Sequence, residues 1–324
     1  MPEFRMLDLG TIKLRAAIQG QGPLVIMVHG FPESWYSWRH QIGPVAEAGF
    51  TACAIDVRGY GGSDKPHPVE AYAMEHMVSD LVGVAECLQP EAPAILLGHD
   101  WGAPMVWNAA LTRPQQFSAV GALSVPYLGV GARPFSEIFD RLFTEKNRFF
   151  YQAYFQAEGV AEAEAEADIR GFLRKFVYAI SGDAPEGTWP NNKTASDPLL
   201  LGLTDPKPFP GWMTEADLDY YESQFMASGL RGPINRYRNH ERDHAWLTPF
   251  VDTQILQPAF FVSGTKDMAF NMMGGADPIV TMRTKVPNLQ VADVLDGCGH
   301  WTQQERPDEI NARLIPWLKG LLTA

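Results

Sequence analysis

The chain is poor in cysteine, in long apolar runs and in secretion signals. Its 324 residues include three cysteines, Cys53, Cys87 and Cys298, and so small and odd a number does not form a disulfide framework. A reducing compartment suits such a chain. No apolar run approaches the ~20 residues that a membrane-spanning helix needs, and the first residues lack the pattern of a signal peptide. We therefore expect a cytoplasmic protein without a membrane partner.

Clusters of positive charge are also absent. Asp and Glu number 38 against 26 Lys and Arg, which gives a net charge of -12. A nucleic-acid partner is therefore not expected, because such proteins carry a basic patch or stripe. Hydrophobic residues make up 46% of the chain and charged residues 20%, as in ordinary globular proteins. The length suggests two domains at roughly 150 residues each.

Short apolar runs bounded by turn residues occur in both end portions of the chain. They are residues 24–29, 51–57, 94–97, 119–125, 259–263 and 289–295. Helical patterns at 75–88 and 102–111 lie between some of them. Alternation of this kind predicts an α/β fold, with a mostly parallel central sheet flanked by helices.

The middle of the chain lacks this strand signal. Aromatic-rich helical patterns at 134–155, 162–180 and 214–228 replace it, together with a loop at 183–207 that is rich in Pro, Asn, Asp and Gly. The economical interpretation is a sheet domain interrupted by an insertion. We predict a core domain of residues 1–127 and 253–324 and a helical cap, or lid, of residues 128–252.

The segment Gly98-His99-Asp100-Trp101-Gly102 joins a predicted strand to a predicted helix. It matches the nucleophile elbow, Gly-x-nucleophile-x-Gly, in which a tight turn requires small residues around the nucleophile. Asp100 stands where serine is usual. Taken alone, this aspartate is explained equally well as a helix N-cap.

Polar residues follow three other predicted strands. His29-Gly30-Phe31-Pro32 lies where an oxyanion-hole loop belongs, and Asp267 and His300 each follow a later strand. Open α/β sheets place their sites at such strand ends, and the order nucleophile, acid, histidine is that of α/β-hydrolases. Singly, each residue is explained as a turn, capping or surface residue; together they favour a triad of Asp100, Asp267 and His300.

Several longer segments resemble the soluble epoxide hydrolases of the α/β-hydrolase superfamily. They span most of the chain and comprise His29–Gln41, Asp56–Pro66, Gly98–Ala103, Tyr154–Glu164, Gly229–Asn239 and Asp296–Pro307. The resemblance implies an α/β-hydrolase fold with an inserted helical cap. It also implies that cap residues Tyr154 and Tyr237 polarise the epoxide oxygen and that the Phe31-Pro32 bond is cis. Ala157-Glu158 departs from the family's usual Glu-Pro.

The resemblance further implies that the enzyme opens a small apolar epoxide to a vicinal diol. Asp100 attacks the ring and forms an ester. Asp267 orients His300, which activates water to hydrolyse that ester. The backbone N–H groups of Phe31 and Trp101 border the substrate and hold the oxyanion. This chemistry requires water but no cofactor or metal, and either a monomer or a homodimer is compatible with it.

Haloalkane dehalogenase is the alternative enzyme. It shares the aspartate nucleophile, the adjacent tryptophan and the fold. Members of that family usually carry Asn after the His-Gly pair as a halide donor, whereas this chain has Phe31 there. The cap tyrosines also favour the epoxide interpretation.

A zinc protease is a second alternative, because His240-Glu241-Arg242-Asp243-His244 matches H-E-x-x-H. No persuasive third ligand follows the motif, and a short pattern of this kind arises by chance. We therefore interpret it as a coincidence and predict no metal site.

A binding protein on a hydrolase scaffold is the third alternative, since a fold does not prove a function. Such proteins usually lose part of the catalytic set, whereas every expected position is filled here.

Overall fold

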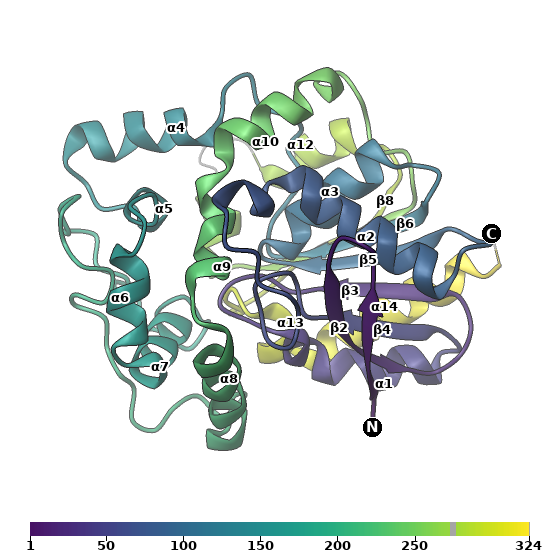
Figure 1. The fold of residues 1–324 in the computed structure, drawn as a ribbon, viewed down its shortest axis with the longest axis horizontal. Helices are drawn as coiled ribbons and strands as arrows, with labels where there is room; N and C mark the ends of the chain where they lie inside the picture. Colours follow the sequence, from purple (N-terminus) through teal and green to yellow (C-terminus); the bar gives the residue numbers. More distant parts are fainter. Residues whose placement is uncertain (273–276, 324) are drawn as a thin grey trace.

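The computed structural model describes residues 1–272 and 277–323, and its centre is a sheet with the strand order β1-β2-β4-β3-β5-β6-β7-β8 (Figure 1). The strands are β1 (Glu3–Asp8), β2 (Lys13–Gln19), β3 (Leu24–Val28), β4 (Thr51–Ile55), β5 (Ala94–His99), β6 (Phe117–Leu123), β7 (Ala259–Gly264) and β8 (Leu289–Leu295). Strands β3 to β8 are parallel, whereas β2 pairs antiparallel with both β1 and β4. The predicted, mostly parallel sheet is confirmed.

Strands β1 and β2 are absent from the sequence-based prediction. Most residues of β1 are exposed, and β2 mixes buried with half-buried positions. Their periodicity is weak because they form the antiparallel edge, where a strand is covered on fewer sides than in the centre. The central strands β3 and β4 are buried almost throughout and were therefore recognisable.

The central strands are buried on both faces of the sheet. In β3, Val25 and Met27 belong to a cluster that includes residues of α1 and α14, whereas Ile26 and Val28 belong to a cluster that includes residues of α2 and α3. This alternation follows from the two-residue period of a strand. The helices outside the central insertion are α1 (Arg39–Glu47), α2 (Met74–Leu88), α3 (Gly102–Thr112), α11 (Met268–Asn271), α12 (Pro278–Lys285), α13 (Thr302–Glu305) and α14 (Pro307–Leu321).

Residues 135–250 form a helical insertion between β6 and β7. Figure 1 shows its helices α4 to α7 away from the sheet, with α9 and α10 beside it. The insertion contains α4 (Phe135–Leu142), α5 (Tyr151–Tyr154), α6 (Val160–Glu166), α7 (Ile169–Ala179), α8 (Glu215–Ser228), α9 (Arg231–Asn235) and α10 (His240–Leu247). The exact limits of the core and cap domains, residues 1–127 and 253–324 against 128–252, stay a prediction.

Two of the long helices predicted in this region are each interrupted in the structure. The stretch 134–155 is divided into α4, a 3₁₀ turn η3 (Thr144–Lys146) and α5. The stretch 162–180 breaks at Asp168, whose side chain accepts a hydrogen bond from the amide of Gly171 and caps α7. Asp is favoured at such a cap because it satisfies free amides at a helix start.

Helix α8 fastens the insertion to the sheet domain. The carboxylate of Asp217 lies 3.2 Å from Nε of Arg39 and accepts a hydrogen bond of 2.9 Å from the Tyr36 hydroxyl. The Trp35 indole donates to the hydroxyl of Tyr220 at 2.6 Å. These contacts join α8 of the insertion to the segment that follows β3. In the described part of the chain, no helix is long and apolar enough to cross a membrane.

Candidate active site

Asp100 sits on a strained turn between β5 and α3. Its φ of 51° lies in the left-handed region, which non-glycine residues seldom adopt outside functional turns. The neighbouring glycines make this turn possible. A Cβ on Gly102 would lie 2.0 Å from the carbonyl oxygen of Val28, and one on Gly98 would lie 2.3 Å from the carbonyl oxygen of Gly102. The tight turn therefore lifts the Asp100 carboxylate above the sheet edge.

The structure brings the three predicted triad residues together. Nε2 of His300 lies 3.3 Å from Oδ2 of Asp100, and Nδ1 of His300 lies 2.9 Å from Oδ1 of Asp267. Asp267 is fully buried and also accepts hydrogen bonds from the Ala269 amide and the Ser263 hydroxyl. The histidine is thus held between two carboxylates that come from the ends of different strands.

The charge of His300 depends on these carboxylates. Burial alone lowers its pKa, but Asp267 and Asp100 oppose that effect so strongly that the pKa lies well above its ordinary value. The backbone is fixed as well, because the His300 carbonyl accepts hydrogen bonds from Nε2 of His99 and from the Ser124 hydroxyl, both at 2.7 Å. The two carboxylates therefore favour the protonated form of His300 in the resting site.

The loop after β3 supplies the expected backbone donor. The amide of Phe31 donates to Oδ1 of Asp100 at 2.6 Å, and the Phe31-Pro32 bond is cis, as expected. Gly30 permits this approach, since a Cβ there would fall 2.1 Å from Oδ1 of Asp100 and 2.5 Å from the amide nitrogen of Trp101. The amides of Phe31 and Trp101 thus border the nucleophile, in the arrangement of an oxyanion hole.

Two tyrosines of the helical insertion lie near the nucleophile. Tyr237 belongs to η4 (Arg236–Arg238), and its ring centroid is 5.2 Å from that of Trp101 and 5.8 Å from that of Tyr151. Burial raises the pKa of both phenols, and the charge of Asp100 raises it further. Both hydroxyls therefore stay protonated at neutral pH and are available as donors.

The structure does not bring Tyr154 into this cluster, contrary to the expectation from the sequence. Its hydroxyl donates a hydrogen bond of 2.7 Å to the Glu164 carboxylate. The same carboxylate accepts hydrogen bonds from the backbone amides of Leu199 and Leu200. Tyr154 thus joins α5 to α6 within the insertion. Tyr151, one helical turn earlier, occupies the place beside Tyr237 that the resemblance predicts for Tyr154.

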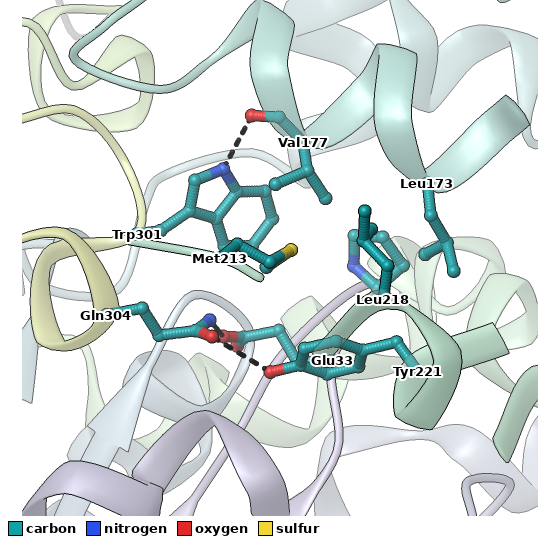
Figure 2. A pocket seen from close by; sticks show the side chains of 9 residues that line it. Glu33, Leu173, Val177, Met213, Leu218, Tyr221, Trp301 and Gln304 are labelled. Carbon is teal, nitrogen blue, oxygen red and sulfur yellow. Dashed lines mark hydrogen bonds between the residues drawn. The ribbon is translucent and has the colours of Figure 1, made fainter. Parts of the chain in front are cut away.

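The surroundings of Phe31 are aromatic. Its ring lies 5.5–6.1 Å from four others, those of Phe155, Phe172, Phe176 and Tyr237. Figure 2 shows a separate small cavity between the insertion and the core, with Glu33, Tyr221 and Gln304 on one side and apolar residues around the rest. Its volume of about 10 Å³ has room for about one water molecule. An organic substrate does not fit there.

The H-E-x-x-H segment lies in α10, and its two histidines contact other segments of the chain. The ring of His240 packs on Phe135 and Phe139, and its burial lowers its pKa to about 3. Nε2 of His244 lies 3.1 Å from the carbonyl oxygen of Gly131. Among the residues that the structure describes, no group of three His, Cys, Asp or Glu side chains is placed to hold a metal ion.

The comparisons with known proteins agree with this geometry. Residues 23–307 match the family model of the alpha/beta hydrolase fold. Epoxide hydrolase A of Mycobacterium tuberculosis is 37% identical over 99% of this chain and 98% of its own length. Bifunctional epoxide hydrolase 2 of Rattus norvegicus is 38% identical over 95% of this chain, which spans 54% of that longer protein.

Solved structures give the same result. An epoxide hydrolase from an endophytic Streptomyces superposes with a TM-score of 0.92 at 44% identity, covering 100% of this chain and 97% of the other. Epoxide hydrolase A from Mycobacterium thermoresistibile has a TM-score of 0.92 at 36% identity, covering 99% of both chains. The chain therefore belongs to the epoxide hydrolases of the α/β-hydrolase fold.

Proposed function

We propose that this protein opens an apolar epoxide to a vicinal diol through a covalent ester on Asp100. The observation that carries the proposal is the carboxylate nucleophile on a nucleophile elbow, within reach of His300 and faced by two protonated phenols. A serine nucleophile suits a carbonyl, whereas a carboxylate displaces the oxygen of a strained ring at an sp3 carbon. Water is the second substrate.

In the first step, an oxygen of Asp100 bonds to an epoxide carbon while the bond from that carbon to the ring oxygen breaks. The electron pair stays on the ring oxygen, which accepts hydrogen bonds from Tyr151 and Tyr237 and takes a proton from one of them. General acid catalysis of this kind contributes about 10²–10⁴ in rate. Tyr151 replaces Tyr154 in this role because it lies beside Tyr237.

In the second step, His300 removes a proton from water, and the resulting hydroxide attacks the ester carbonyl. The amides of Phe31 and Trp101 hold the oxyanion, and the acyl bond breaks to release the diol and the Asp100 carboxylate. Before this step, the tyrosinate left by ring opening takes the proton that His300 carries in the resting site, so the imidazole is neutral when it meets the water. The proton of the attacking hydroxide then passes to the leaving alkoxide, and His300 keeps the proton taken from water, as in the resting site. The imidazole is free to act because alkylation neutralises Asp100 and so removes one of the two charges that raise the His300 pKa.

The neighbours of Phe31 indicate what kind of epoxide fits. They are aromatic and fully or nearly fully buried. Such walls favour an apolar substrate, since a charged group would lose its hydration without a partner. We propose apolar alkyl or aryl epoxides as the substrate class.

The test is to incubate the purified protein with a panel of epoxides and haloalkanes, with and without EDTA, and to quantify diol and halide. The proposal expects diol from epoxides at a rate that EDTA does not change. Halide without diol would make the protein a haloalkane dehalogenase. Diol formation that EDTA abolishes would contradict the ester route and restore a metal to the mechanism.

A further inference from the structure

Arg236 is a buried cation directly beside the site. It precedes Tyr237 in η4, and the residue is 1% exposed. The central carbon of its guanidinium lies 4.6 Å from the ring centroid of Trp101. The same indole contacts the ring of Tyr237 edge to face. The Arg236 guanidinium therefore packs against Trp101, the residue after the nucleophile Asp100. In the sequence, Arg236 is also the direct neighbour of Tyr237, whose phenol lies near Asp100.

The guanidinium of Arg236 is only partly satisfied. It donates to the carbonyl of Tyr72 and forms an ion pair with Asp243, which in turn accepts the amide of Met74 at 2.7 Å. Its Nε has no hydrogen-bond partner among the residues described. The nearby His240 is neutral, because burial and Arg236 lower its pKa to about 3. A buried and incompletely paired charge is costly, and such groups concentrate at functional sites.

The Arg236 cation interacts with the charge of the neighbouring phenols. Burial lowers the pKa of Arg236 to about 9, and interaction with the phenols of Tyr237 and Tyr60 opposes that shift. An interaction between two charges is mutual, so the guanidinium and a negative charge on the Tyr237 phenol stabilise each other. Burial, Asp100, Tyr151 and Tyr60 all act in the opposite direction and raise the Tyr237 pKa.

We propose that Arg236 is a positioning residue for ring opening, which holds Trp101 and Tyr237 in place and stabilises the negative charge that Tyr237 acquires. The inference rests on the proposed epoxide opening at Asp100. As the carbon–oxygen bond breaks, the ring oxygen takes the phenolic proton and the negative charge passes to the Tyr237 oxygen, with which the Arg236 charge interacts. Hydrolysis of the ester uses His300 and water, and Arg236 has no direct part in it.

The variants Arg236→Gln and Arg236→Lys separate charge from structure. Single-turnover ring opening is measured for epoxides whose leaving alkoxides differ in basicity, and ester hydrolysis is measured separately. We expect Arg236→Gln to slow ring opening of the most basic leaving group by about 10- to 100-fold and hydrolysis by less than about 3-fold. The loss should shrink as the alkoxide becomes less basic. Arg236→Lys should restore the wild-type dependence on leaving-group basicity.

Arg238 provides a matched control. It is 7% exposed, lies two residues away in the same turn and is paired with Glu162 through two nitrogens. Arg238→Gln should lower stability without changing the dependence on the leaving group. If Arg236→Gln slows both steps equally, or slows all epoxides equally, the inference is overturned.

A second variant covers the case in which Arg236→Gln does not fold. Asp243→Asn removes the counter-ion of Arg236 and keeps the guanidinium. The rate of ring opening should then depend less steeply on the basicity of the leaving alkoxide. An unchanged dependence overturns the role of Arg236. The proposed function fails separately, if the wild-type protein forms no ester adduct with any epoxide.

Discussion

The sheet and the helical insertion contribute to the site in different ways. Asp100, Asp267 and His300 follow the ends of β5, β7 and β8, where strand pairing and a tight turn fix the backbone before any side chain is considered. Tyr151 and Tyr237 come from a four-residue helix and a 3₁₀ turn, and their places depend on side-chain packing. The sheet therefore supplies the bond-forming groups, and the insertion supplies donors that its own packing orients.

The largest effect should come from the residue that the sheet contributes most directly. Asp100→Ala removes the nucleophile, and we expect turnover to fall by on the order of 10⁶-fold, as for other covalent enzymes. The fold should persist, because alanine keeps the Cβ of Asp100 and adds only a small cost in the left-handed backbone conformation, which aspartate tolerates somewhat better. The measurement is the diol yield together with circular dichroism. Activity within about 100-fold of wild type would mean that water attacks the epoxide directly.

His300→Gln should separate the two steps. Ring opening does not need a base, so the ester should still form, whereas its hydrolysis should slow by about 10⁴-fold. Mass spectrometry of the intact protein after exposure to an epoxide should show the added mass of one substrate, located on the peptide that contains Asp100. An unmodified protein that still consumes epoxide would contradict the covalent mechanism.

The tyrosines of the insertion allow a paired comparison within α5. Tyr151→Phe should slow ring opening by about 10²-fold or more, because it removes a donor to the leaving oxygen. Tyr154→Phe should leave turnover within about 3-fold but lower the free energy of unfolding by about 1 kcal/mol, through the lost bond to Glu164. Single-turnover kinetics and urea unfolding measure the two effects. The reverse pattern would identify Tyr154 as the donor to the leaving oxygen.

The smallest effect concerns pH. In the resting enzyme, Asp267 and Asp100 together raise the pKa of His300 despite its burial. In the ester, Asp100 is neutral, so the His300 pKa should be lower than in the resting enzyme. Hydrolysis requires the neutral imidazole and should therefore rise with pH through this lower value. NMR titration gives the His300 pKa in the resting enzyme, and the pH profile of ester hydrolysis gives its pKa in the ester. Equal pKa values in the two states would contradict this prediction.

The difference between the two regions also explains what sequence can predict. The central strands and the positions of Asp100, Asp267 and His300 were predictable, because short apolar runs end at the same edge of a parallel sheet. The antiparallel edge strands β1 and β2 were not, since their exposed faces leave little periodicity.

The insertion was less predictable because its packing is set by distant contacts. Tyr151 and Tyr154 lie three residues apart, and which one faces the nucleophile depends on the rotation of a short helix. Glu164, on the next helix, accepts a hydrogen bond from the Tyr154 hydroxyl and so fixes the rotation of that short helix. Arg236 was missed for a related reason, since nothing in a run of polar residues shows that one arginine is buried against Trp101.

The most direct test of the account is a single turnover in water labelled with ¹⁸O, with enzyme in excess over epoxide. If Asp100 attacks the ring, the oxygen added to the first diol comes from its carboxylate, because hydrolysis breaks the acyl bond. The account therefore predicts an unlabelled diol in the first turnover and ¹⁸O in the peptide that contains Asp100. Labelled diol in the first turnover, with no label in that peptide, would contradict it.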